Sequence, residues 1–209
     1  MTKTVTRLFD DYADARGAVR ALEAAGFAHD DVSIVANKEA YGRNDRDNDD
    51  VHDDSVNDDG DVTRGATTGA VLGGVGGLLA GLGLLAIPGL GPIVAAGWLA
   101  STAAGAAIGG VGGAATGGIV GALKNAGHDD DEAQVYSEGV RRGGTLVSAR
   151  VSEERRAEAE SILLNFNSVD AATRGAAYRE TGWTSFDPNA DPYTRDQIDA
   201  DRAGGTTFR

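Results

Sequence analysis

The chain has 209 residues, no cysteine and a formal net charge of −13. The charge excludes a broad nucleic-acid-binding face, and the missing cysteines exclude disulfides, thiolate metal sites and cysteine nucleophiles. The length suffices for one or two domains. No signal-peptide pattern precedes the first charged residues, so we expect the N-terminus to lie in the cytoplasm.

Residues 1–37 have the pattern of a strand, a helix and a second strand. Residues 4–9 alternate like a short strand, and Asp10 or Asp11 can cap the helix that follows. Residues 30–36 read as the second strand. We interpret this region as the first half of a small α/β domain.

Residues 38–64 form an acidic linker. Nine aspartates crowd into residues 44–61, a composition that repels itself and has little to bury, so we expect disorder there. Residues 55–60 resemble the start of an EF-hand loop, although Ala66 occupies the position of the bidentate glutamate. A solvated linker is the interpretation we favour over a weak cation site.

Residues 65–123 contain no charged residue and hold 19 of the 31 glycines. We expect two helices here, over 65–87 and 93–123, joined by a turn at Pro88, Gly89, Gly91 and Pro92. Small residues recur every fourth position, which places them on one helix face where another backbone can approach closely. The glycines that we expect to pack helices are Gly65, Gly69, Gly73, Gly77, Gly81, Gly97, Gly105, Gly109, Gly113, Gly117 and Gly121.

The predicted helical hairpin is long and apolar enough for a membrane. A helix needs about 20 apolar residues to span a bilayer, and each predicted helix is longer than that. Lipid would also force these glycine-rich segments to be helical. The alternative is a soluble oligomer whose hairpins bury one another. A pore or transport component is a third possibility, for which only a few serines and threonines offer a polar lining.

Residues 124–174 predict the other half of the domain. A helix should begin within 129–132 and end near residue 143, and residues 145–151 form a clear strand. Residues 152–155 loosely match a capping box before a further helix, and residues 168–173 suggest a last short strand. The fold class is therefore α+β: a small ferredoxin-like sandwich split by the glycine-rich hairpin. Both halves must then lie on the same side of any membrane.

Residues 175–209 form a tail. It is either a disordered arm or an extension draped on the domain. It holds five of the twelve aromatic residues of the chain: Tyr178, Trp183, Phe186, Tyr193 and Phe208.

Nothing in the sequence forms a convincing catalytic or cofactor motif. Residues 81–86 match the loose G-x-G-x-x-A dinucleotide pattern, but no strand precedes them and no acidic residue follows at the required spacing. His29, His52 and His128 are isolated from one another and make no metal-ligand spacing. We expect no enzyme activity, no cofactor, no metal, no nucleic acid and no specific small-molecule ligand.

Both ends of the chain resemble the small domain of a bacterial general-stress-protein family. The similarity rests on residues 5–10, 18–22, 26–27 and 32–35, and it resumes at residues 136–147. A glycine-rich apolar insertion also resembles members described as low-temperature-induced or stress-responsive membrane proteins. The resemblance implies a stress-linked, non-catalytic role and supplies no catalytic residues. Together with the glycine pattern, it predicts a self-associating protein of the cell membrane with both termini in the cytoplasm.

Overall fold

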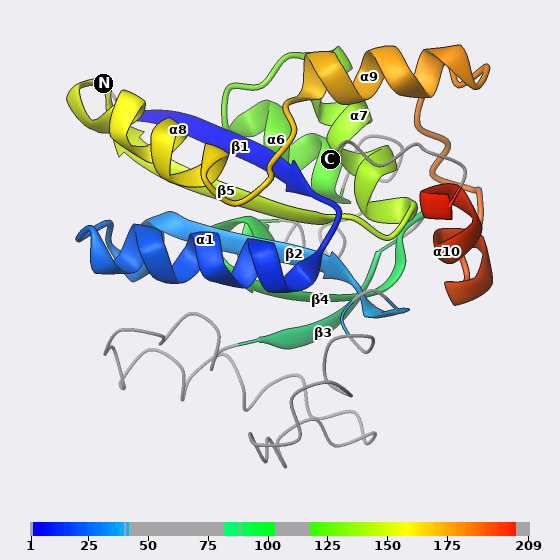
Figure 1. Cartoon of the computed structure of the whole chain (residues 1–209), viewed down its shortest axis with the longest axis horizontal. Helices are drawn as coiled ribbons and strands as arrows, with labels where there is room; N and C mark the ends of the chain where they lie inside the picture. The colour runs from blue at the N-terminus through cyan, green and yellow to red at the C-terminus, as the bar shows by residue number, and fades with distance from the viewer. Residues whose placement is uncertain (1, 40, 42–81, 88, 103–117, 204–209) are drawn as a thin grey trace, which may run out of the picture.

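A computed structural model describes residues 2–39, 41, 82–87, 89–102 and 118–203 of the chain. These residues form an α+β fold in three layers, in which a five-stranded sheet lies between two groups of helices (Figure 1).

The N-terminal half begins with a strand, a helix and a second strand, as the sequence predicts. Asp11, and not Asp10, caps the helix, because its side chain accepts a hydrogen bond from Ala13 N at 2.7 Å. A short 3-10 helix precedes the second strand. The elements are β1 (Thr2–Phe9), α1 (Tyr12–Ala24), η1 (His29–Asp31) and β2 (Val32–Asn37).

The C-terminal half contributes one strand and most of the helices. The predicted helix and strand after residue 124 are both present, and further helices lie on either side of them in the sequence. The elements are α6 (Gly118–Asn125), α7 (Asp130–Arg141), β5 (Thr145–Ser152), η2 (Glu153–Arg155), α8 (Arg156–Leu164), α9 (Ala171–Glu180) and α10 (Arg195–Ala203).

The strand from the C-terminal half lies inside the sheet. The order is β1-β5-β2-β4-β3, and all neighbouring strands are antiparallel. β5 therefore pairs with β1 on one side, where Leu146 lies opposite Leu8, and with β2 on the other, where Val147 lies opposite Ile34. The two halves, far apart in sequence, form one hydrogen-bonded sheet.

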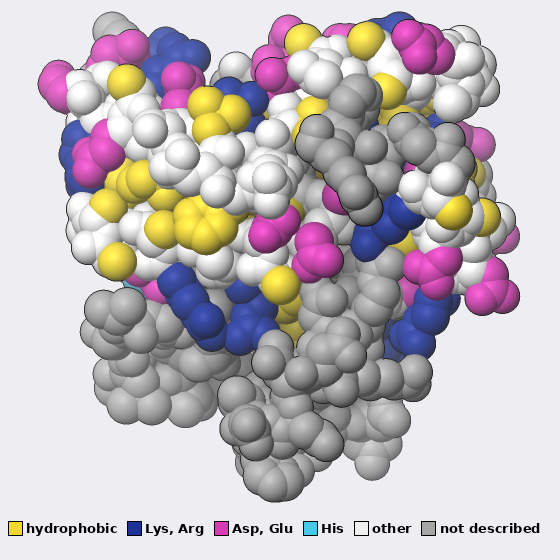
Figure 2. Space-filling model, in the orientation of Figure 1, with side chains coloured by type: hydrophobic (Ala, Val, Ile, Leu, Met, Phe, Trp, Pro, Cys, Tyr) yellow, Lys and Arg dark blue, Asp and Glu magenta, His cyan; other side chains and the backbone are white. Residues whose placement is uncertain are grey.

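Side chains alternate between two cores, one on each face of the sheet. Val147 and Ile34 pack with α1 and α8, whereas Leu146 and Val35 pack with α6, α7 and α9. Figure 2 shows the face that carries α1 and α8, where hydrophobic side chains lie between the two helices and charged side chains of both signs surround them. Because both faces are covered, the inner strands are apolar on both sides.

The predicted helical hairpin is wrong for residues 83–87 and 93–97 of the apolar block, whereas residues 98–102 and 118–123 are helical, as expected. Residues that we expected in two helices instead form β3 (Gly83–Ile87) and β4 (Gly91–Gly97), which pair with each other and extend the sheet beyond β2. A helix resumes at residues 98–102. None of the helices in the described residues has the length and apolar character needed to cross a membrane.

The physical reason lies in how β4 is buried. Its residues Ile93 to Ala96 are buried in a sheet that is covered on both faces, so the strand reads as a continuous apolar run. Periodicity does not separate such a run from a buried helix. The predicted turn does exist at this place, but it joins strands, with positive φ at Gly89 and Gly91.

Three smaller predictions have different outcomes. The prediction of a strand at residues 168–173 is wrong. Val169 forms an isolated bridge to Leu8, and α9 begins two residues later. The capping box at 152–155 does not form, since Ser152 makes no capping hydrogen bond and the next residues are a 3-10 turn. Over residues 175–203 the tail is draped on the domain, the second of the two alternatives.

A substitution at Gly97 tests whether residues 91–97 form a strand. It has a φ of +85° at the end of β4, and a Cβ there would lie 2.2 Å from the carbonyl oxygen of Val32. We expect Gly97→Ala to lower the unfolding free energy by at least about 2 kcal/mol, because strain and steric overlap add. Gly83→Ala is the matched control, since its nearest atom is 3.9 Å away. Denaturant titration measures both, and equal stability of the two variants would contradict the strand assignment.

Candidate functional site

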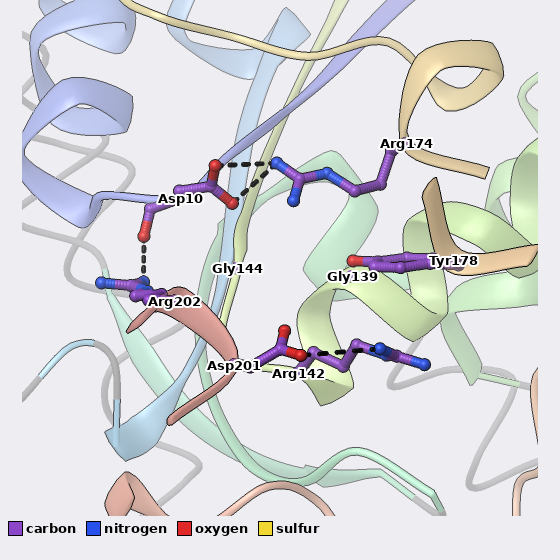
Figure 3. Close-up of a pocket in the computed structure, with 8 residues that line it drawn as sticks. All are labelled: Asp10, Gly139, Arg142, Gly144, Arg174, Tyr178, Asp201 and Arg202. Carbon is purple, nitrogen blue, oxygen red and sulfur yellow. Dashed lines mark hydrogen bonds and ion pairs between the residues drawn. The ribbon is translucent and has the colours of Figure 1, made fainter. Parts of the chain in front are cut away.

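Charged side chains converge where the end of β1, the end of α7, α9 and α10 meet. Figure 3 shows this site, which we call the arginine cluster. A small cavity of about 20 Å³ lies at its centre. Its lining residues are Asp10, Gly139, Arg142, Gly144, Arg174, Tyr178, Asp201 and Arg202.

The pair of Asp10 and Arg174 joins the two ends of the fold. Asp10 lies between β1 and α1, whereas Arg174 belongs to α9. One terminal nitrogen of Arg174 donates to both carboxylate oxygens, at 2.7 and 2.8 Å, and the arginine side chain is only 4% exposed. Charge-assisted bonds of this length are among the stronger hydrogen bonds in proteins, which makes the pair a specific link.

Glu138 is a buried acid close to this pair. It is 1% exposed and accepts hydrogen bonds from Arg141 at 2.5 Å and from Arg142 at 2.6 Å. The hydrogen bond to Glu138 is the main reason that the pKa of the Arg141 guanidinium is raised. Arg142 also lies over the ring of Tyr178, with its guanidinium carbon 4.3 Å from the ring centre. The negative charge of Glu138 is thus balanced by two neighbouring guanidinium groups, as a buried charge requires.

The helix α10 closes the site from the C-terminal side. Arg202 donates to the backbone oxygen of Asp10 and, at 3.4 Å, to that of Gly143. Ile198 packs on Gly143, where a Cβ would lie only 2.5 Å from the Ile198 Cδ1 atom. Gly143 also has a φ of +90°, so the close approach of α10 depends on a glycine there.

The arrangement is suited to fastening the tail. Acidic and basic side chains alternate around the cavity, and the cavity has room for about one water molecule. Burial raises the pKa of the Tyr178 hydroxyl, which keeps that group neutral beside the charges. The chemistry that these groups support is ion pairing and hydrogen bonding between α7, α9, α10 and the end of β1.

The sequence did not predict the arginine cluster. Asp10 was considered only as a helix cap, and Arg174 lies 164 residues away, so no local pattern joins them. Glu138 and Arg142 do have helical spacing, which is a recognisable local signal. Only the packing of the tail shows that they share a site with Asp10.

Of the predicted helix-packing glycines, only two lie in the described residues. Gly97 ends a strand, so the predicted helix packing is wrong for it, whereas Gly121 lies in a helix, α6, which packs against α7. The other predicted positions lie outside the described residues: Gly65, Gly69, Gly73, Gly77, Gly81, Gly105, Gly109, Gly113 and Gly117. Pro88 and the EF-hand-like segment 55–60 lie outside them as well.

The other sequence motifs also have structural outcomes. Residues 83–86 of the dinucleotide-like pattern belong to β3, so the turn before a helix that such a site needs is not formed. His29 lies 3.5 Å from Glu23, and His128 bonds to Thr6 and Glu132. Among the described residues no three potential metal ligands cluster.

Comparison with known proteins found no matching family model, no similar curated protein and no similar solved structure. The resemblance to the general-stress-protein domain therefore stays a prediction from residues.

Removing Arg174 tests how much the arginine cluster contributes to stability. Arg174→Ala removes the buried guanidinium and leaves the partly buried carboxylate of Asp10 without this partner, so we expect a loss of about 3 kcal/mol in unfolding free energy. Arg156→Ala is the control, because its pair with Glu160 is exposed and should contribute less than about 0.5 kcal/mol. Urea denaturation compares them; similar losses would show that the cluster does not fasten the fold.

The buried hydroxyl of Tyr178 predicts a pH dependence. Its pKa in the fold is raised above the ordinary value of 10.0, so above pH 10 the unfolded chain releases the proton while the folded chain retains it. Stability is therefore lost as the pH rises. Between pH 8 and pH 11 we expect the unfolding free energy of Tyr178→Phe to fall by about 1.4 kcal/mol less than that of the parent. An identical fall in both would place the hydroxyl in a solvated environment.

Proposed function

We propose that the protein is a non-catalytic, self-associating protein of the bacterial stress response. Self-association is carried by two glycine-rich segments, 65–81 and 103–117. The observation that supports this proposal is the position of β3 and β4, which lie between these segments in the sequence and belong to the sheet. The apolar block is thus continuous with a folded protein core.

This position favours a shared protein core over two membrane-spanning helices. With β3 and β4 in the sheet, and with residues 98–102 and α6 packed in the core beside it, the segments 65–81 and 103–117 that remain have 17 and 15 residues. A spanning helix needs about 20. Glycine at every fourth position of 65–81 offers a smooth surface to a second segment of the same kind. Burial between copies removes this apolar surface from water.

The cell membrane is the second candidate location, with both termini in the cytoplasm. It is supported by the absence of charge over residues 65–123, a feature that suits lipid as well as protein. The ferredoxin-like classification of the β1–α1–β2 and α7–β5–α8 units belongs to the same proposal. Its support is the strand–helix–strand order of the first unit and the insertion of β5 between β1 and β2.

The assembly proposal is tested by replacing one glycine in each segment. Gly73→Leu with Gly113→Leu puts bulky side chains on the predicted contact face, so we expect the oligomer mass, measured by light scattering, to fall toward that of one chain. Ala157→Leu adds a leucine on the exposed surface of α8 and should leave the mass unchanged. An unchanged mass in the double variant would sink the proposal.

Fractionation of the parent protein separates the two locations. Recovery of the oligomer in the supernatant of a detergent-free lysate supports the shared core. Recovery in the membrane pellet, with release only by detergent, supports the membrane candidate.

A further inference from the structure

The outer edge of β1 is open to another strand. Among the described residues, β1 is the first strand of the sheet and β5 is its one partner strand. On its outer side Leu8 exchanges two backbone bonds with Val169, at 2.9 and 2.8 Å. By the two-residue period of a strand, the backbone groups of Thr2, Thr4 and Thr6 face the same way as those of Leu8. Within the described residues, no backbone–backbone hydrogen bond continues this row.

A groove of about 540 Å³ runs along this edge. Its open stretch from Thr2 to Thr6 is about 14 Å long, enough for roughly five residues of extended chain. One wall comes from α7, the loop before it and the start of α9. The other comes from α8, through Arg156 and Glu160.

The wall on the α7 side is small, partly apolar and held in place. Gly127, Ala171 and Ala172 leave room there, beside the ring of Tyr136. The hydroxyl of Tyr136 donates to the Thr6 carbonyl oxygen at 2.8 Å. A carbonyl oxygen has a second lone pair, so Thr6 can still accept a bond from an added strand.

His128 is fixed at the same wall by a hydrogen bond at each of its two ring nitrogens. One nitrogen lies 2.7 Å from Thr6 Oγ1 and the other 2.9 Å from a carboxylate oxygen of Glu132. The edge of His128 also lies against Tyr136, with ring centres 5.8 Å apart. The wall is therefore organised before any ligand arrives, which lowers the entropic cost of binding.

The two walls differ in chemistry. Side chains of an added strand alternate between them. Those directed to the α7 side meet small and aromatic groups, beside two carboxylates that already have partners, since Glu132 pairs with His128 and Asp170 with Arg7. Those directed to the α8 side meet a positive and a negative charge at Arg156 and Glu160. The groove thus matches a segment that alternates apolar with charged residues.

We propose that the β1 edge binds one extended segment of a partner protein as an added strand, with apolar side chains toward α7 and charged side chains toward α8. The Leu8–Val169 pair already uses this mode, and the partner continues the same row at Thr6, Thr4 and Thr2. A folded copy of this chain fits less well, because walls on both sides recess the edge. The inference is independent of the glycine-rich segments.

A synthetic peptide tests the proposal on the full chain. The probe is a fluorescently labelled, end-capped hexapeptide, Val-Glu-Val-Lys-Val-Glu, and binding is followed by anisotropy. Two further peptides carry N-methyl groups on the three valines or on the three charged residues. Because alternate N–H groups face β1, we expect one methylated peptide to lose binding and the other to retain it. No saturable binding, or equal binding of all three peptides, would overturn the proposal.

Thr4 supplies the matched protein variants. Thr4→Pro removes the outward N–H, and proline is tolerated at an edge where that N–H faces solvent. Thr4→Val keeps the N–H and, like proline, loses the hydroxyl bond to the Ala126 carbonyl oxygen. We expect Thr4→Pro to weaken peptide binding roughly tenfold and Thr4→Val to bind as the parent does. Equal affinities of the two variants would contradict strand addition.

Two controls keep these outcomes separate. Circular dichroism checks that each variant is folded, and if Thr4→Pro is not, the methylated peptides decide alone. Light scattering without peptide tests for a second copy at the edge. A dimer that is lost in Thr4→Pro but kept in the Gly73→Leu and Gly113→Leu double variant would show that a second copy of the chain occupies the edge. That outcome would overturn the proposal of a partner segment.

Discussion

The fold depends on the two ladders of hydrogen bonds that β5 makes with β1 and β2. β1 and β2 come from the N-terminal half and do not pair with each other; β5, from the other half, lies between them. Without β5, β1 would have no strand beside it and β2 would pair with β4 alone. Both hydrophobic cores contain β5 side chains, Leu146 in one and Val147 in the other.

The C-terminal helices α9 and α10 also join the two halves of the domain. β5 joins the halves through backbone hydrogen bonds, and the arginine cluster joins them through side chains. Arg174 and Arg202 reach Asp10 from two different helices of the tail, one through the carboxylate and one through the backbone oxygen. The end of β1 is therefore fixed by backbone pairing with β5 and by the bonds that Arg174 and Arg202 make to Asp10. Charges buried at this end are acceptable because each acid has an arginine partner within the cluster.

Local patterns predicted the elements that recognisable residues mark in the sequence. β1, α1, β2, α7 and β5 lie near the predicted positions because caps, glycines and alternation mark them. β4 was missed because its buried residues form a continuous apolar run, which periodicity does not distinguish from a helix. β3 is a largely exposed strand at the edge of the sheet, and it was missed because the glycine spacing around it indicated a helix. α9 was missed because its cap, Asp170, follows a single bridging residue that looked like a strand. The arginine cluster depends on contacts between distant segments, which no local pattern records.

The central place of β5 has a consequence for how the protein is made. Residues 38–144 are synthesised between β2 and β5. At roughly 5–20 residues per second, the ribosome needs seconds to add them. During that time β1 and β2 have emerged without the strand that joins them, and the whole uncharged block emerges before it. The sheet can therefore be completed only late in translation, after the most apolar segment of the chain has left the ribosome.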